Sequence, residues 1–391
     1  MSQLLLCFFI FIYISSIVII SPQTVEADFH VFTNNMYIST YLQSGSFIYY
    51  TLDLESNVTW ISDFLFGDHP PSRHTKVGNE LIRTKNSDVS GEVYKGNLQL
   101  ILRKGYVDEK TTNITDIHYV KVNEGFIEIS FEATFGFSFQ LVNINYSPTH
   151  VLYQNNLIRA KKFTLVFNNS YVNGVIYFGE IPSHIIQDNY YETKLNILSI
   201  NHLWNIKLKY YIINANTLNV SYLNKHKAIF STNTNYILAP KQYFENIKRL
   251  YLNKYIENKE CVISVGSIIK CDKIINENYI VFVIENKKFE LSGRELFYKV
   301  SRQYEFLIQQ NQMNDMWIFG NFFLTNYITS FNYDEQIVSL YSQKKIYDDL
   351  NIIHQQQNDI KKQIYIYLMC VLFVCILFYK VANLSSALAI I

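Results

Sequence analysis

Short runs of β-branched and aromatic residues recur along most of the chain, and they constrain the fold more than any other feature. Asn, Asp, Ser and Gly separate these runs, which include SFIYYTLDL, GNLQLILRKG, KFTLVF, GVIYFG, IKLKYYII, ENYIVFVIE and KFELSG. Such runs with turn-forming residues between them are typical of β-strands. Helices are predicted only after Pro240, in KQYFENIKRLYLNKY, and near Glu295 to Gln303. We therefore expect an all-β protein.

The N-terminal end starts with an almost unbroken apolar run from Leu4 to Ile20, which polar residues follow. This length and position are typical of a secretory signal peptide. The stretch Val25-Glu26-Ala27 has small or tolerated residues at the cleavage positions, so we predict a signal peptide over residues 1–27. Because no Lys or Arg precedes the apolar run, an uncleaved signal anchor is the alternative.

The C-terminal end is apolar again, and the stretch from Ile364 to Tyr379 contains no charged residue. A membrane-spanning helix needs about 20 apolar residues. Lys380 interrupts the run, but VANLSSALAII follows it, and a lysine near a helix end can extend its ammonium group to the lipid headgroups. We predict a transmembrane helix over residues 364–391. The polar segment 343–363 has apolar residues at helical spacing, which predicts a stalk helix.

The two ends together predict a single-pass type I topology, with the C-terminal helix in the membrane. The bulk of the chain is then lumenal or extracellular, in the secretory pathway or at the cell surface. The overall charge is nearly balanced, with 34 Lys and Arg against 33 Asp and Glu. Since no basic run or basic aromatic patch occurs, no nucleic-acid partner is expected.

The five cysteines fall into two groups. Cys7 lies in the predicted signal peptide, and Cys370 and Cys375 lie in the predicted membrane helix. Cys261 and Cys271 remain in the lumenal part, and an oxidising compartment favours a disulfide between them. Closing so short a loop contributes about 2–3 kcal/mol. A metal site is the lesser alternative, because no His pair stands nearby at ligand spacing.

Lumenal N-x-S/T sequons occur at Asn57, Asn113, Asn145, Asn168 and Asn219. Such sequons are frequent by chance in an Asn-rich chain. Those at Asn113, Asn168 and Asn219 sit in polar segments and are predicted to carry glycans.

Motifs of several enzyme classes are absent, including G-x-S-x-G, H-E-x-x-H, the Walker motif and the dinucleotide-binding motif. The nine His residues are scattered, and His69 and His74 flank a Pro-Pro loop that we expect to be solvated. No metal site is expected.

Two segments resemble each other, and each places a small polar cluster directly after an apolar strand. They are FIYYTLDLESNVTWI, residues 47–61, and AIFSTNTNYILAP, residues 228–240. An apolar motif with glycine follows each segment, at residues 134–137 and 317–320. The chain is therefore predicted to form two β lobes, residues 28–190 and 191–342, each with a turn aimed at the cleft between them.

This arrangement resembles the pepsin-like aspartic proteases over about Tyr37 to Tyr341. In that family each lobe supplies a D-T-G-S/T turn, which an apolar-apolar-Gly motif supports. The matching residues, in chain order, are Asp53-Leu54-Glu55-Ser56 with Trp60, Ser231-Thr232-Asn233-Thr234 with Pro240, the Cys261 and Cys271 pair, Ile318-Phe319-Gly320-Asn321 with Phe322-Phe323-Leu324, and Phe331-Asn332. The resemblance implies a bilobal pepsin-like fold and no cofactor.

Peptide hydrolysis in this family uses two carboxylates about 3 Å apart that share one proton. One carboxylate acts as a base on a bridging water, and the other acts as an acid toward the carbonyl. The resemblance assigns Asp53 to the first carboxylate position, but Ser231 stands at the second. A serine hydroxyl can hydrogen-bond water, but it cannot hold the second charge.

The two turns depart from the family pattern further. Leu54 replaces the Thr whose hydroxyl braces the turns against each other, whereas Thr232 keeps its counterpart. Glu55 and Asn233 replace the turn glycines, and we expect their side chains to disturb the tight backbone approach. Because Glu55 belongs to the same turn as Asp53, on the other lobe from the missing carboxylate, we do not expect it to substitute. The resemblance leaves Ser56, Thr232 and Thr234 as turn-supporting residues and places Thr84 at the flap tyrosine.

The sequence thus predicts a membrane-anchored pepsin-family homologue that has lost its protease activity and binds a peptide or protein segment in its interlobe cleft. The first alternative is an active membrane-bound aspartic endopeptidase with an unusual site. The second is a structural surface glycoprotein in which the cleft has no role.

Overall fold

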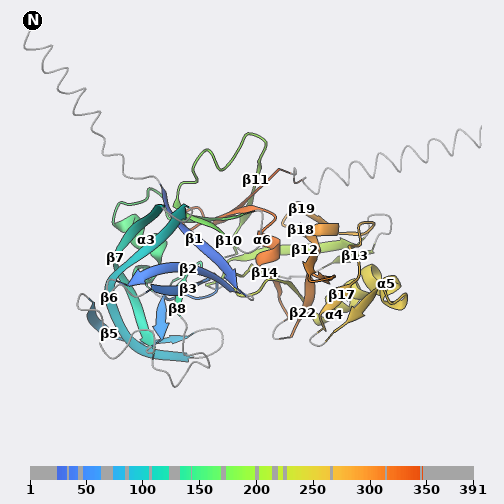
Figure 1. Ribbon diagram of the computed structural model, residues 1–391, viewed down its shortest axis with the longest axis horizontal. Coiled ribbons are helices and arrows are strands. Elements are labelled where there is room, and N and C mark those ends of the chain that lie inside the picture. The colour runs from blue at the N-terminus through green and yellow to red at the C-terminus, as the bar shows by residue number, and fades with distance from the viewer. Residues whose placement is uncertain are drawn as a thin grey trace, which may run out of the picture.

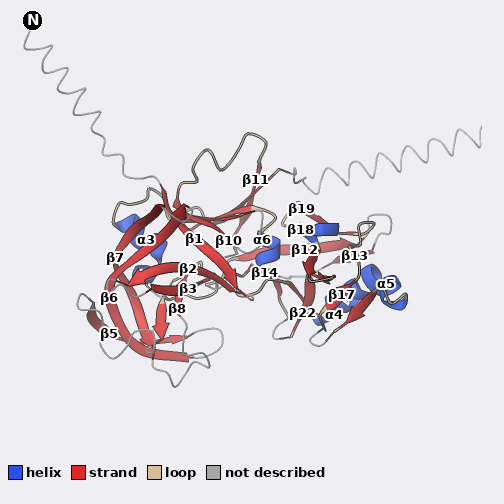
Figure 2. Cartoon of the chain, viewed as in Figure 1, coloured by secondary structure: helices blue, strands red, loops and turns tan. Residues whose placement is uncertain are grey.

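The computed structural model describes residues 24–32, 35–42, 47–62, 74–83, 88–104, 108–122, 133–141, 143–168, 173–198, 202–213, 219–222, 227–264, 267–312, 315–343 and 346. This part of the chain consists mostly of strands, with a few short helices (Figure 2). The predicted mainly β fold is therefore confirmed. The predicted transmembrane helix over residues 364–391 and nearly all of the predicted stalk lie outside the described residues.

The strands of the first lobe belong to a sheet of 13 strands, in which neighbours are hydrogen-bonded. Its order is β11 (Tyr191–Asn196), β25 (Ile337–Ser342), β24 (Ile328–Asn332), β9 (Lys162–Phe167), β10 (Asn173–Gly179), β1 (Thr24–Phe32), β2 (Asn35–Leu42), β3 (Phe47–Asp53), β8 (Ala133–Gly136), β4 (Trp60–Ser62), β7 (Asp108–Val122), β6 (Asp88–Lys104) and β5 (Thr75–Arg83).

The second lobe contains two smaller sheets. The larger has the order β19 (Lys287–Ser292), β18 (Tyr279–Ile284), β12 (Asn205–Ile213), β14 (Lys227–Phe230), β23 (Trp317–Phe319), β15 (Ile237–Pro240) and β22 (Ile308–Asn311), and β13 (Asn219–Tyr222) pairs with β12. The smaller has the order β16 (Cys261–Ile263), β17 (Ile269–Cys271), β21 (Gln303–Phe306) and β20 (Phe297–Val300). In Figure 1 the strands β2–β8 lie at one end of the molecule and β12–β22 at the other.

The described helical segments are all short. They are η2 (Ile144–Tyr146), α3 (Pro148–Gln154), α4 (Lys241–Ile247), the π-helical turn η3 (Lys248–Leu252), α5 (Asn253–Glu257), η5 (Gly293–Glu295) and α6 (Asn321–Leu324). The segment from α4 to α5 confirms the helix predicted after Pro240. The helix predicted from Glu295 to Gln303 is wrong, because the capping box of Ser292 and Glu295 closes a single turn and β20 then pairs with β21.

The two lobes repeat one arrangement of four strands. In the first lobe β3 runs parallel to β8, β8 antiparallel to β4, and β4 parallel to β7. In the second lobe β14 runs parallel to β23, β23 antiparallel to β15, and β15 parallel to β22. This repetition bears out the resemblance between residues 47–61 and 228–240, since both segments occupy the same place in their lobes.

The predicted lobe boundaries differ from the sheet boundaries at two places. β11, β24 and β25 follow residue 190 in the chain, yet they pair with each other and with β9 of the first half. A sheet that continues from one half into the other leaves fewer unpaired strand edges than two separate sheets would. At the N-terminus Thr24 already pairs with Gly179, so the sheet begins before residue 28, the expected start of the first lobe.

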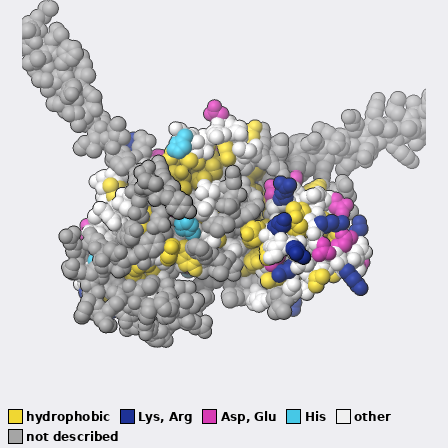
Figure 3. All heavy atoms as spheres, viewed as in Figure 1, with side chains coloured by type: hydrophobic (Ala, Val, Ile, Leu, Met, Phe, Trp, Pro, Cys, Tyr) yellow, Lys and Arg dark blue, Asp and Glu magenta, His cyan; other side chains and the backbone are white. Residues whose placement is uncertain are grey.

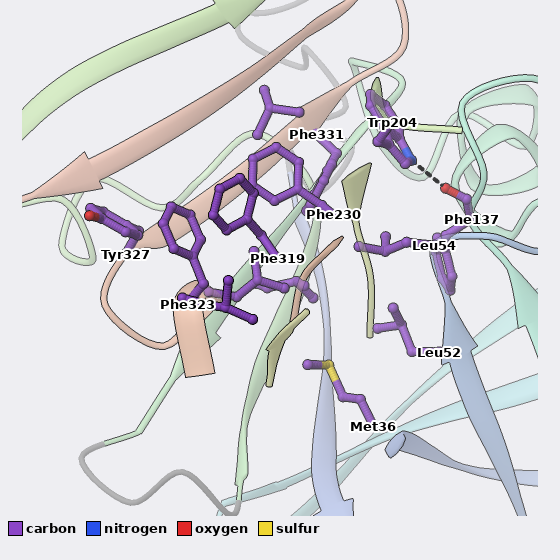
Figure 4. Close-up of a cluster of buried hydrophobic side chains, with 14 of the residues drawn as sticks. Met36, Leu52, Leu54, Phe137, Trp204, Phe230, Phe319, Phe323, Tyr327 and Phe331 are labelled. Carbon is purple, nitrogen blue, oxygen red and sulfur yellow. Dashed lines mark hydrogen bonds between the residues drawn. The ribbon is translucent and has the colours of Figure 1, made fainter. Parts of the chain in front are cut away.

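A single buried aromatic and aliphatic cluster joins the two lobes (Figure 4). Trp204, which precedes β12, donates its indole N–H to the Phe137 carbonyl oxygen at 2.7 Å. Its ring also packs against Phe331 of β24, with ring centroids 5.0 Å apart. Each fully buried aromatic side chain contributes several kcal/mol on removal from water, so this cluster fixes the position of one lobe against the other.

On the face in Figure 3, Lys and Arg side chains and Asp and Glu side chains are interspersed over the second lobe. The salt bridge between Lys270 and Glu305, at 3.4 Å, belongs to that lobe.

Over the ranges that the structure describes, no helix has the length and apolar character that crossing a membrane requires.

Candidate functional site

The two predicted turns each follow the end of a strand that has a parallel partner. β3 ends at Asp53, which lies opposite Gly136 of β8 in the register. β14 ends at Phe230, and the next residue, Ser231, donates its backbone N–H to the Phe319 carbonyl oxygen at 3.1 Å. Each turn is therefore held by the apolar strand that carries the glycine motif.

Both motif glycines stand where no side chain fits. A Cβ at Gly136 would lie 2.5 Å from the Val58 carbonyl oxygen. A Cβ at Gly320 would lie 2.4 Å from the Thr234 carbonyl oxygen. These contacts are with backbone atoms of the two turns, so only glycine permits the close approach. The support predicted for the apolar-Gly motifs is confirmed in both lobes.

A threonine hydroxyl joins the turns in one direction. Thr232 is fully buried, and its Oγ1 donates to the Leu52 carbonyl oxygen and accepts from the Leu54 N–H at 3.3 Å. Leu54 has no hydroxyl with which to return these bonds. Half of the brace that the resemblance implies is therefore present, and the other half is absent, as the sequence predicts.

The side chains at the two turn positions where the family has glycine cross between the lobes. Ser231 Oγ donates to Glu55 Oε1 at 2.6 Å, and Asn233 Nδ2 donates to Asp53 Oδ1 at 2.7 Å. The side chains of Glu55 and Asn233, which we expected to disturb the close backbone approach, bridge the two turns. We did not expect Glu55 to substitute for the missing carboxylate, because it belongs to the other lobe; its carboxylate nevertheless contacts Ser231, the residue at the second carboxylate position.

The Asp53 carboxylate lies in an unfavourable electrostatic environment. Burial and the negative charge of Glu55 raise the pKa of Asp53 to about 6. The backbone N–H groups of Glu55 and Ser56 and the Asn233 amide oppose this rise by donating hydrogen bonds. The neighbouring carboxylate of Glu55 therefore makes ionisation of Asp53 costly.

His202 also lies within electrostatic reach of the site. Burial lowers the pKa of His202, and the negative charge of Glu55 opposes this fall. The site therefore has two carboxylates on the first turn and neutral hydrogen-bonding groups on the second, with one imidazole nearby. This set can hold or move a proton, but it lacks a carboxylate on each side of a shared water.

The other predicted turn residues make local contacts. Ser56 Oγ donates to the Val58 carbonyl oxygen at 2.9 Å, and Thr234 Oγ1 accepts from the Tyr236 N–H at 3.2 Å. Asn321 donates through Nδ2 to the Thr232 carbonyl oxygen at 3.3 Å, and it is a further support of the second turn.

The sequence interpretation missed the partnerships of Glu55 with Ser231 and of Asn233 with Asp53. A signal was present, because both turn glycines are replaced together by long polar side chains. One of these is an acceptor and the other a donor, which matches the serine and the aspartate that they meet.

The remaining predicted residues lie outside the site. Thr84 lies outside the described residues; the strands on either side of it in the chain, β5 and β6, pair antiparallel, with Arg83 opposite Asp88. Cys261 and Cys271 form the predicted disulfide between β16 and β17.

The three sequons that were predicted to carry glycans lie at or near strands. Asn113 in β7 and Asn168 after β9 are exposed, and Asn219 begins β13. His74, which we expected in a solvated loop, is partly buried and contacts the Tyr119 hydroxyl through Nδ1. The Pro-Pro loop itself lies outside the described residues.

Comparison with solved structures shows the same fold in proteins of different names. Basic 7S globulin from soybean has a TM-score of 0.66 and 12% identity, over 83% of this chain and 95% of that one. Conglutin gamma from lupine seeds has a TM-score of 0.67 and 12% identity, over 82% and 95%. The aspartic proteinase from Irpex lacteus has a TM-score of 0.60 and 13% identity, over 82% and 97%.

A family model described as eukaryotic aspartyl protease matches residues 88–343. The match includes the second turn, the disulfide and the late glycine motif, and the first turn repeats the same strand arrangement. The chain belongs to the eukaryotic aspartyl protease family.

Proposed function

We propose that this chain is a pepsin-family pseudoprotease, which binds a peptide or protein segment between its lobes without hydrolysing it at the rate of an active member. The observation that carries this proposal is the 2.6 Å hydrogen bond from Ser231 Oγ to Glu55 Oε1. The hydroxyl at the second carboxylate position is committed to a side chain.

The mechanism of the family needs a water that two carboxylates approach from opposite lobes. The direct hydrogen bond to Glu55 occupies the Ser231 hydroxyl, which stands where the second carboxylate would contact that water. On the other side, Asp53 accepts from the Asn233 amide at 2.7 Å. Loss of a general acid or base typically costs about 10²–10⁴ in rate, and these contacts oppose placement of the water as well.

Binding does not need the second carboxylate. An extended peptide can add to exposed strand edges through its main-chain hydrogen bonds. The fold also occurs in proteins named globulins as well as in one named an aspartic proteinase, and a shared fold does not determine activity.

We also propose that the domain is tethered to a membrane by residues 364–391, with the bulk of the chain lumenal or extracellular. The uncharged run from Ile364 to Tyr379 supports this proposal. Protease protection of the full chain in sealed microsomes tests it: the domain is expected to stay intact until detergent is added. Digestion in intact microsomes would contradict the topology.

Proteolysis by the full chain, purified in detergent, tests the loss of activity. A fluorogenic peptide library is incubated from about pH 3 to about pH 7, with and without a statine-containing transition-state inhibitor. We expect no inhibitor-sensitive cleavage. Cleavage that the inhibitor blocks and that Asp53→Asn abolishes would refute the pseudoprotease proposal.

Binding is tested with the statine-containing peptide as probe, by surface plasmon resonance on the same protein. Asn233→Phe places a bulky ring where the Asn233 amide meets Asp53 and is expected to weaken binding at least about tenfold, which corresponds to about 1.4 kcal/mol. Val262→Phe is the matched control, because Val262 is exposed on β16 of the four-stranded sheet. Equal binding by both variants would remove the interlobe site from the function.

One observation favours a second candidate, an active endopeptidase that uses Asp53 and Glu55 as its carboxylate pair. Glu55 brings a carboxylate to the second turn, and the charge of Glu55 contributes to the raised pKa of Asp53. If this candidate is right, Glu55→Gln abolishes cleavage in the same assay, whereas Asn233→Ala retains it.

A further inference from the structure

The two turns have opposite hydrogen-bonding character. The first turn supplies both acceptors, the carboxylates of Asp53 and Glu55, and the second supplies both donors, the Ser231 hydroxyl and the Asn233 amide. Each bond joins residues about half the chain apart, with sequence separations of 176 and 180 residues. The pairs are crossed: the first residue of one turn, Asp53, meets the later residue of the other, Asn233, and the later residue Glu55 meets the earlier residue Ser231.

Burial makes the match between the turns energetically important. Glu55 is 6% exposed and Ser231 is 1% exposed. A buried carboxylate that loses its donor pays the full desolvation cost of that group, which exceeds the value of the bond itself. A third carboxylate in the same space would add like-charge repulsion to that cost.

The threonine brace between the lobes is also incomplete. Thr232 bonds to the Leu52 carbonyl oxygen and the Leu54 N–H, but Leu54 cannot return these bonds. The two crossing bonds lie on the same turns and add two further connections between them.

We propose that Glu55 and Asn233 act as a reciprocal latch that holds the two turns together, and that Ser231 and Glu55 are interdependent residues. The latch takes over the bracing that Leu54 cannot provide. Ser231 is then the hydrogen-bond donor that Glu55 requires, in addition to being the residue that replaces the second carboxylate.

Double-mutant cycles on the full chain test the latch, with unfolding in urea followed by tryptophan fluorescence. Glu55→Ala and Ser231→Ala are expected to couple by about tenfold in the unfolding equilibrium constant, and Asp53→Ala and Asn233→Ala by a similar factor. Glu55→Ala with Thr234→Ala is the control, because Thr234 Oγ1 accepts from the Tyr236 N–H within its own turn. That pair is expected to couple less than about twofold.

Changing the residue at position 55 provides the sharper test. Ser231→Asp alone is expected to lower stability, because the introduced carboxylate faces Glu55. In a Glu55→Gly chain, the same change is expected to cost at least about tenfold less in the unfolding equilibrium constant. An equal cost in both backgrounds, or coupling no larger than the Thr234 control, would overturn the latch.

Hydrogen exchange keeps the test decisive if a variant folds poorly. Amides at residues 52–56 and 231–234 are expected to exchange faster in Asn233→Ala than in the wild type, with amides of the four-stranded sheet unchanged. Unchanged exchange at both turns would contradict the latch. Proteolysis by the wild type would refute the proposed function alone, so the two failures are distinguishable.

Discussion

Removing the charge of Asp53 is expected to stabilise the protein at neutral pH. The pKa of Asp53 rises from 3.8 to about 6 on folding, through burial and the charge of Glu55. The folded state therefore binds this proton more tightly than the unfolded state does. Stability from this group is fully present below about pH 4 and is lost as the pH rises through about 6.

The size of the effect follows from the shift. A rise of about two pKa units corresponds to an upper value of about 3 kcal/mol. In the wild type the Glu55 N–H donates to Asp53 Oδ1 at 2.7 Å. Asp53→Asn keeps a side-chain oxygen that can accept this bond. The variant is thus expected to be more stable than the wild type by up to about 3 kcal/mol at pH 7.5, and nearly equal to it at about pH 3.5.

Urea unfolding of both proteins at several pH values measures this difference. Trp204 and Trp317 are fully buried, so their fluorescence reports unfolding of the domain. Asp334→Asn is the matched control, because Asp334 is exposed and pairs with Lys161 at 2.8 Å. Loss of that exposed pair is expected to cost about 0–1 kcal/mol.

The result that would refute the reasoning is specific. A difference between Asp53→Asn and the wild type that stays constant from about pH 4 to about pH 7.5 would mean that the pKa of Asp53 does not rise on folding. A variant less stable than the wild type at neutral pH would mean that the hydrogen bonds to the carboxylate outweigh its burial.

Three further changes test the support of the turns and the disulfide. Thr232→Val removes a fully buried hydroxyl, which leaves backbone groups of the first turn without their hydrogen-bond partner. It is therefore expected to lower the stability measured by urea unfolding by about 1–3 kcal/mol. No loss of stability would show that the brace is dispensable. Gly320→Ala places a methyl group against backbone carbonyls, whereas Gly78→Ala, the control, meets nothing within 4 Å. Thermal unfolding is expected to show a loss of about 1–3 kcal/mol for Gly320→Ala alone. Equal losses for both variants would contradict the packing argument. Replacing Cys261 and Cys271 together by Ala is expected to cost about 2–3 kcal/mol, and a variant as stable as the wild type would mean that the disulfide adds nothing.

Most of the fold was predictable because it depends on local patterns. The runs KFTLVF, GVIYFG, IKLKYYII and KFELSG lie in β9, β10, β12 and β19, since β-branched and aromatic residues favour strands wherever they occur together. The segment after Pro240 is helical, as its local sequence also predicts. The helix predicted near Glu295 is wrong for a tertiary reason, because pairing with β21 makes a strand of residues that also suit a helix.

The candidate site divides in the same way. The sequence by itself determined that the family's second carboxylate is missing at Ser231, because residue identity and order along the chain carry that information. It also determined the strands, the two turns and their glycine supports. Only the tertiary structure decided what faces Ser231. Glu55 comes from the other lobe, 176 residues away, and the direction of a side chain across an interface depends on how the lobes pack, which sequence spacing does not specify.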